Sequence, residues 1–192
     1  MDGGQAVVRT LIDYGVDTAF SVPGESYLPI LRAIQNAGNA IQLVTPRHES
    51  GVTFAAEAYG KLTGRPAAGF VSRGPGATNA SIGVHTASQD STPLLLFVGH
   101  VPTGSKGKEA FQEVDYHQMF GKIAKGVFEP ESSAEVPDVV ARAVTLTTAG
   151  RPGPVIVVMP KDITEGDAGD AAAPPLRPRA PVSYTHLRAH ET

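Results

Sequence analysis

The sequence predicts an α/β fold of three layers, in which a mainly parallel six-stranded sheet carries helices on both faces. Short apolar runs alternate with amphipathic segments of about 10 to 15 residues, which is the pattern of repeated βαβ units. One run, Leu94–Val98, is apolar at every position, as is typical of a strand covered on both sides. Right-handed crossovers then bring the carboxyl ends of the strands to one edge of the sheet, where ligands bind in such folds.

Helices are predicted where apolar residues recur at three- and four-residue spacing. The first covers Gln5–Tyr14 and is ended by Gly15. A tight turn, Gly74-Pro75-Gly76, is expected to lead into the fourth, which runs to about Ala87. The remaining helices are predicted at Tyr27–Ala37, Glu49–Leu62, Val114–Phe120 and Ala134–Ala149.

Strands are predicted at the short apolar runs between these helices. They cover Thr18–Val22, Ile41–Val44, Ala67–Val71, Leu94–Val98, Ile123–Val127 and Val155–Val158. Residues 1–165 thus form one domain. Residues 166–181, rich in Asp, Ala, Gly, Pro and Arg, have no apolar period and are interpreted as an interdomain linker.

The last eleven residues, 182–192, are interpreted as non-native. Back-translated, this segment resembles a transposon-type sequencing-library adaptor read in frame, so we exclude it from the fold. A disordered tail and a metal-binding pair of His186 and His190 are the alternatives. If the adaptor interpretation is right, the chain is a fragment of a longer protein.

Composition excludes several classes of protein. The chain of 192 residues has no cysteine, which excludes a disulfide scaffold, a thiolate zinc site, an iron–sulfur cluster and a cysteine nucleophile. Its formal charge of −3 shows no electrostatic footprint for nucleic acid. No run of about 18 apolar residues predicts a membrane span, no signal peptide is recognisable, and no metal site is predicted. We expect a cytoplasmic protein.

Four loops follow the first four strands, and each has an ordinary structural interpretation. Glu49 is a first-turn carboxylate that the helix dipole favours, and His48 beside it is a surface histidine or a hydrogen-bonded core histidine. Asn79 is a turn or cap residue, and Gly74-Pro75-Gly76 matches no phosphate-binding fingerprint. Close backbone approach to a flat ligand is the functional alternative for this glycine-rich loop.

Taken together, the loops resemble a known family. The stretches on which the resemblance rests are GVDTAFSVPG at Gly15–Gly24, RHESGVTFAAEAYGKLTGRPAAGFVSRGPGATN from Arg47, AFQE from Ala110 and RPGPVIVVMPK from Arg151. In order and spacing, residues 1 to about 165 closely resemble the N-terminal pyrimidine-binding (PYR) domain of thiamine-diphosphate-dependent enzymes. The nearest group is the acetolactate synthase, pyruvate oxidase and benzoylformate decarboxylase family, and AFQE favours its acetolactate synthase side.

The resemblance implies particular site residues. Glu49 matches the catalytic glutamate that hydrogen-bonds the aminopyrimidine of thiamine diphosphate and thereby activates the cofactor for attack on a 2-keto acid. The other cofactor-facing matches are Pro23, Gly24, Ser72, Pro75 and Asn79. Phe111 and Gln112 match positions close to the substrate.

The resemblance also implies what the chain lacks. In this family a C-terminal domain binds the diphosphate through Mg²⁺, and each active site lies between two subunits. We therefore expect a homodimer or homotetramer when the protein is full length, and no turnover by this fragment alone. The alternative is a stand-alone, non-catalytic PYR-like module that pairs with a separate diphosphate-binding chain.

Overall fold

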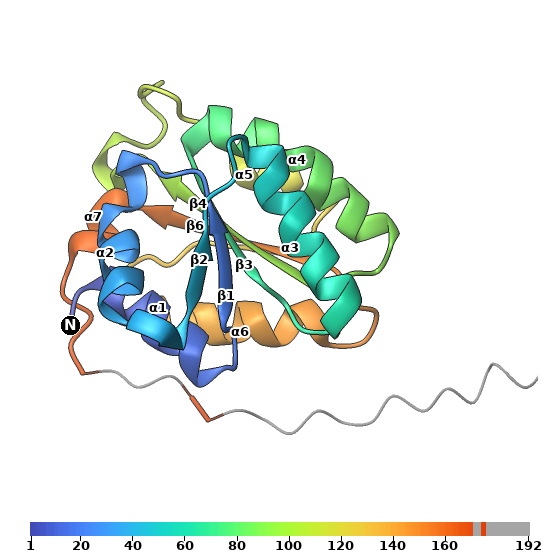
Figure 1. The fold of residues 1–192 in the computed structure, drawn as a ribbon. Coiled ribbons are helices and arrows are strands. Elements are labelled where there is room, and N and C mark those ends of the chain that lie inside the picture. Colours follow the sequence, from blue (N-terminus) through green and yellow to red (C-terminus); the bar gives the residue numbers. More distant parts are fainter. Residues whose placement is uncertain (171–173, 176–192) are drawn as a thin grey trace, which may run out of the picture.

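The computed structural model describes residues 1–170 and 174–175 of the chain. Six strands form one sheet in the order β2-β1-β3-β4-β6-β5, and every neighbouring pair is parallel. Figure 1 shows α1 and α6 on one side of this sheet and α3 and α4 on the other. The predicted three-layer α/β fold is confirmed.

The strands and helices lie close to their predicted positions. The strands are β1 (Thr18–Ser21), β2 (Gln42–Val44), β3 (Ala68–Ser72), β4 (Leu94–His100), β5 (Gly126–Phe128) and β6 (Pro154–Pro160). The helices are α1 (Gly3–Asp13), α2 (Leu28–Asn36), α3 (Glu49–Thr63), α4 (Arg73–Gln89), α5 (Tyr116–Phe120), α6 (Val136–Thr148) and α7 (Lys161–Glu165).

The centre of the sheet is covered on both faces. Every residue of β4 and β6 is buried, as the continuous apolar run of β4 predicts. Alternate strand residues point to opposite faces, so Phe70 and Phe97 join the core under α1, α2 and α6. Val71 and Val98 join the core under α3 and α4. These two cores hold the carboxyl ends of the strands in register.

Among the boundaries that differ from the predicted ones, two have a clear physical reason. Gly74, Pro75 and Gly76 form the first turn of α4 and not a turn before it. Proline is tolerated there because the first N–H groups of a helix have no intrahelical partner. The fifth strand is β5 and begins at Gly126, because Ile123 and Ala124 still bond to the end of α5 through their N–H groups. The short helix α7 was not predicted.

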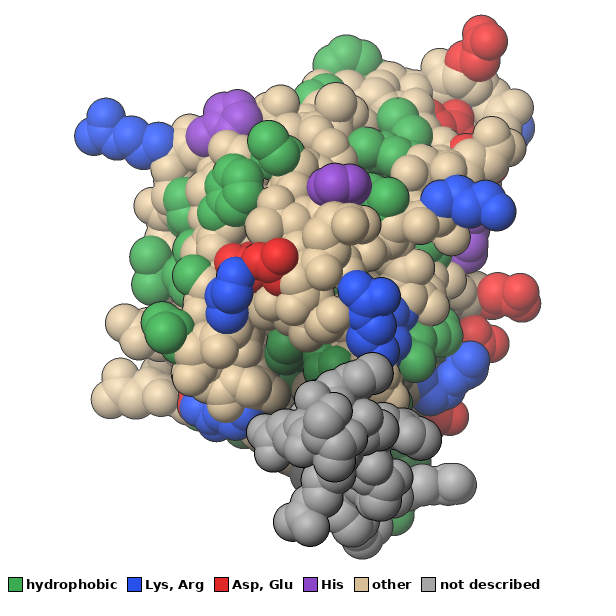
Figure 2. Space-filling view, turned by 90° about the vertical axis from the view of Figure 1, so that its right-hand side faces the viewer, with side chains coloured by type: hydrophobic (Ala, Val, Ile, Leu, Met, Phe, Trp, Pro, Cys, Tyr) green, Lys and Arg blue, Asp and Glu red, His purple; other side chains and the backbone are tan. Residues whose placement is uncertain are grey.

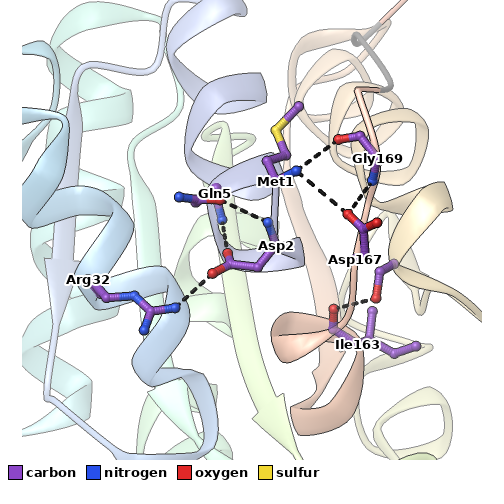
Figure 3. A network of polar contacts seen from close by, with 8 residues as sticks. Met1, Asp2, Gln5, Arg32, Ile163, Asp167 and Gly169 are labelled. Carbon is purple, nitrogen blue, oxygen red and sulfur yellow. Dashed lines mark hydrogen bonds and ion pairs between the residues drawn. The ribbon is translucent and has the colours of Figure 1, made fainter.

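The N-terminus lies beside the segment that follows α7 (Figure 3). Asp2 caps α1 by accepting the Gln5 N–H at 2.8 Å, and it pairs with Arg32 of α2 at 2.7 Å. The amino group of Met1 lies 3.6 Å from the Asp167 carboxylate and donates to the Gly169 carbonyl at 3.1 Å. The first residues of the predicted linker therefore pack against the domain.

The remaining predictions about the C-terminal part lie largely outside the described residues. Residues 171–173 and 176–192 include most of the predicted linker and all of the proposed adaptor segment. The division of the chain at residue 165 stays a prediction. Within residues 1–170 and 174–175, no helix combines the length and the apolar character that a membrane crossing requires.

Candidate functional site

The candidate residues gather where the parallel strands end. Pro23 and Gly24 follow β1, and the loop with Phe111 and Gln112 follows β4. Ser72 is the last residue of β3 and lies opposite Gly99 of β4. Because all strands run the same way, these loops share one edge of the sheet with the start of α3.

Glu49 and Asn79, which are 30 residues apart in the sequence, meet at this edge. Glu49 begins α3 and is half-buried, and the Asn79 amide of α4 donates to its Oε2 at 2.9 Å. Among the described residues, Oε1 of Glu49 has no hydrogen-bond partner. His48 caps the helix by accepting the Ser50 N–H at 3.2 Å. One carboxylate oxygen is thus held in place while the other is available to a ligand.

Close packing of α3 on α4 brings this pair together. At Gly83 of α4, a Cβ would lie 2.5 Å from Cβ of Thr53 on α3 and would collide with its hydroxyl. The same hydroxyl donates to the Ala80 carbonyl at 2.9 Å. Only a glycine permits this approach, so Gly83 sets the distance between the two helices that carry Glu49 and Asn79.

The loop after β1 packs on the end of β3. A Cβ on Gly24 would lie 2.5 Å from Cβ of Ser72, so no larger residue fits there. The Ser72 hydroxyl lies 2.8 Å from that of Ser26. The Tyr27 hydroxyl donates to the Val22 carbonyl. Burial is the main cause that raises the pKa of Tyr27 to about 12, and the charge of Glu49 contributes in the same direction. Gly24 and the Ser26–Ser72 contact therefore hold the loop after β1 against the end of β3.

Pro75 is exposed in the first turn of α4, four residues before Asn79. Residues at this spacing lie on one face of a helix, so Pro75 extends the same surface. Phe111 and Gln112 reach α4 through the backbone, because the Gln112 carbonyl accepts the Gly74 N–H at 2.9 Å. The Phe111 side chain is 76% exposed, and the structure places it at the edge without joining it to Glu49.

Sequence reasoning assigned no role to three further residues at this edge. Among the described residues, the buried side-chain polar atoms without partners are Nε of Arg73, Nδ1 of His100 and the hydroxyl of Tyr116. The His100 and Tyr116 rings contact edge to face with centroids 4.8 Å apart, and both line a hollow of about 290 Å³. Burial lowers the pKa of His100 and raises that of Tyr116. An arginine inside a glycine-rich loop was the one signal in the sequence.

The arrangement suits a flat, nitrogen-containing ring. Glu49 offers a free carboxylate oxygen at this edge, and Gly24 lets the loop after β1 pack directly on Ser72 of β3. In the described part of the chain, no three His, Asp or Glu side chains form a group that could hold a metal ion.

Comparison with known proteins points the same way. Residues 1–119 match the family model described as thiamine pyrophosphate enzyme, N-terminal TPP binding domain. The acetolactate synthase large subunit of Lactococcus lactis is 41% identical over 174 residues, or 91% of this chain and 30% of that protein. The large subunit of acetolactate synthase isozyme 3 from Escherichia coli is 40% identical over 163 residues, which cover 85% of this chain and 28% of that subunit. The mitochondrial catalytic subunit of acetolactate synthase from Saccharomyces cerevisiae is 38% identical over 164 residues, which cover 85% of this chain and 24% of that subunit. The chain therefore spans less than a third of each of these relatives.

Proposed function

Because this chain belongs to the thiamine pyrophosphate enzyme family, as an acetolactate synthase-like PYR domain, we propose that it supplies the pyrimidine-binding half of an active site that acts on 2-keto acids. The reaction would be decarboxylation or carboligation in the full-length protein. The observation that carries the proposal is the Glu49–Asn79 pair, with one carboxylate oxygen held and the other available at the edge where the parallel strands end.

Glu49 would bind and orient the cofactor. Its free Oε1 would hydrogen-bond a ring nitrogen of the aminopyrimidine and hold or release a proton there, while the Asn79 amide keeps the carboxylate in position. Asparagine can only donate to this oxygen through its amide, so it orients the group without competing for the proton. When bound, thiamine diphosphate supplies the carbon nucleophile that attacks the keto carbon.

The other predicted residues would shape the surroundings of the ring. Pro23 and Gly24 would contact its face, with Ser72 supporting them from β3. Pro75 would extend the wall on α4. Phe111 is largely exposed and would cover the substrate together with Gln112 once the rest of the site is present. Exclusion of water at this point strengthens the hydrogen bonds that the edge makes to its ligand.

A second polypeptide surface would complete the site. Mg²⁺ and the diphosphate would be bound by a C-terminal domain, and a homodimer or homotetramer would bring that domain to this edge. Apolar side chains project from the layer of α3 and α4, where Phe54 is 41% and Ile82 is 55% exposed. Figure 2 shows hydrophobic side chains scattered over one side of the molecule, among isolated charged and histidine side chains. Exposed apolar side chains of this kind favour contact with a partner surface. We expect the fragment alone to be inactive, and the protein to be cytoplasmic.

The first experiment is to read the source DNA beyond codon 181. If the frame continues into a diphosphate-binding domain, the full-length protein with Glu49→Gln should bind thiamine diphosphate in calorimetry and turn pyruvate over at least about 100-fold more slowly. Glu165→Gln, on the exposed part of α7, is the matched control. Unchanged turnover in Glu49→Gln contradicts the role of Glu49. A genuine stop codon favours the stand-alone module that pairs with another chain.

A further inference from the structure

Arg73 is the first residue of α4, directly after β3. Its side chain is only 11% exposed, although arginine is seldom buried without partners. Its Nη2 donates to Oε1 of Glu25 at 2.9 Å, and its Nη1 lies 3.5 Å from the Phe111 carbonyl. One guanidinium therefore touches the loop after β1 and the loop after β4 at the same time.

The backbone beside Arg73 joins the same two regions. The Gly74 N–H donates to the Gln112 carbonyl at 2.9 Å, and a Cβ on Gly74 would lie 2.8 Å from the Val114 side chain. Arg73 has a φ of +47° and Gln112 a φ of +64°. Both lie in the left-handed region of backbone conformation, which residues other than glycine rarely adopt. Two unfavourable conformations at one contact indicate that tertiary contacts determine the geometry there.

The charge of Arg73 reaches the groups beneath the loop after β4. It counteracts the effect of burial on the pKa of Tyr116, which remains raised, and it adds to the lowering of the pKa of His100. Glu25 is 69% exposed, so the ion pair has one buried and one solvated member. The buried member, Arg73, belongs to α4 and contacts the loop after β1 and the loop after β4.

We propose that Arg73 is a positioning residue that ties the loop of Pro23, Gly24 and Glu25 to the loop of Phe111 and Gln112. It thereby determines where the substrate-facing wall stands relative to Glu49. Arginine suits this task because its planar guanidinium presents donors in several fixed directions, whereas lysine offers a single point of charge. That this wall faces a substrate rests on the proposed function. The link between the two loops does not depend on it.

Hydrogen exchange on the present chain tests the link without any cofactor. In Arg73→Lys and Arg73→Met, amides of residues 104–115 should exchange about ten- to a hundredfold faster, the factor expected for losing charge-assisted hydrogen bonds. Residues 94–100 of β4 should be unchanged. Glu25→Gln keeps the arginine and should give a smaller effect of the same kind. Since it alters only an exposed side chain, it also provides a test if the Arg73 variants fold poorly.

Arg65→Met is the matched control. Arg65 pairs with Asp17 at 3.1 Å and is 54% exposed, on a part of the surface distant in sequence from both loops. It should leave exchange in residues 104–115 as it is in the unaltered chain. Equal exchange in residues 104–115 of the unaltered chain and of all Arg73 and Glu25 variants would overturn the proposal.

Kinetics of the full-length enzyme test the consequence for substrate. Arg73→Lys should raise KM for the 2-keto acid about tenfold or more, with kcat and thiamine diphosphate affinity changed less than about threefold. A purely structural role would instead lower the fraction of active enzyme and leave KM unaltered. If Glu49→Gln abolishes turnover while Arg73→Lys has normal KM, the positioning role fails and the proposed function stands. If neither variant affects turnover, the proposed function fails.

Discussion

The contact between Gly83 and Thr53 allows a stability prediction to be worked out from the structure. In Gly83→Ala, the new Cβ would lie 2.5 Å from Cβ of Thr53 and 2.9 Å from its carbonyl carbon. Real Cβ atoms do not approach this closely, and one of the opposing atoms belongs to the backbone of α3. The helices must therefore separate, since a rotamer change of Thr53 cannot remove the overlap.

Three effects determine the magnitude. Overpacking of a tight core costs about 1 to 3 kcal/mol. Moving Thr53 also weakens its hydrogen bond to the Ala80 carbonyl, worth about 1 kcal/mol. Alanine is the better helix former by about 1 kcal/mol, which offsets part of this loss. We expect a net destabilisation of about 1 to 3 kcal/mol, or a midpoint about 2 to 12 °C lower for a domain of this size.

Urea unfolding followed by circular dichroism measures this difference. Gly104→Ala is the control, because a Cβ there meets nothing within 4 Å. It should unfold within about 0.5 kcal/mol of the unaltered chain. If Gly83→Ala proves as stable as Gly104→Ala, the two helices have room to spare. Gly83 then does not set the helix spacing that brings Glu49 and Asn79 together.

Three further predictions concern single side chains. Asn79→Ala should change the free energy of unfolding by less than about 0.5 kcal/mol, because the residue is exposed. It should slow turnover of the full-length enzyme about tenfold, because the Glu49 carboxylate loses the amide that holds it. Equal turnover rates would exclude an orienting role of Asn79. Tyr27→Phe should destabilise the chain by about 1 kcal/mol or more in urea, since the Val22 carbonyl and a buried serine lose their partner. Burial lowers the pKa of His100 below 6.5 in the folded state, so the unfolded state binds the proton more readily and stability falls as the pH drops below about 6.5. His100→Gln should flatten this pH dependence, and an unchanged slope in urea titrations between pH 7 and 5 would count against it.

The fold and the identity of most site residues could be predicted because they depend on local patterns. Apolar runs and helical periods located all six strands, with β5 displaced by a few residues. The position of Glu49 at the start of a helix follows from the same reasoning. Helix termini were harder, since Gly74, Pro75 and Gly76 suit both a turn and a first helical turn. Only packing of α4 on the sheet decides between the two.

Arg73 and His100 show where reasoning from sequence stops. An arginine after a strand is ordinarily solvated. Its place in a glycine-rich loop does not indicate that it is buried between two loops that lie about 50 and 40 residues away. His100 ends a buried strand, and its ring contact with Tyr116 depends on how the intervening loop folds back. Contacts of this kind join segments that have no common sequence pattern.

Sequence pattern alone predicts the alternation of strands and helices, the parallel sheet, and the edge at which its loops gather. These follow from periodicity and from the handedness of βαβ units, which each segment expresses locally. Only the tertiary structure decided that Asn79 holds one oxygen of Glu49, that Gly83 sets the spacing of their helices, and that Arg73 joins two loops. Packing fixes the separation of distant segments to within a few tenths of an ångström, because close-packed interiors constrain every neighbour at once.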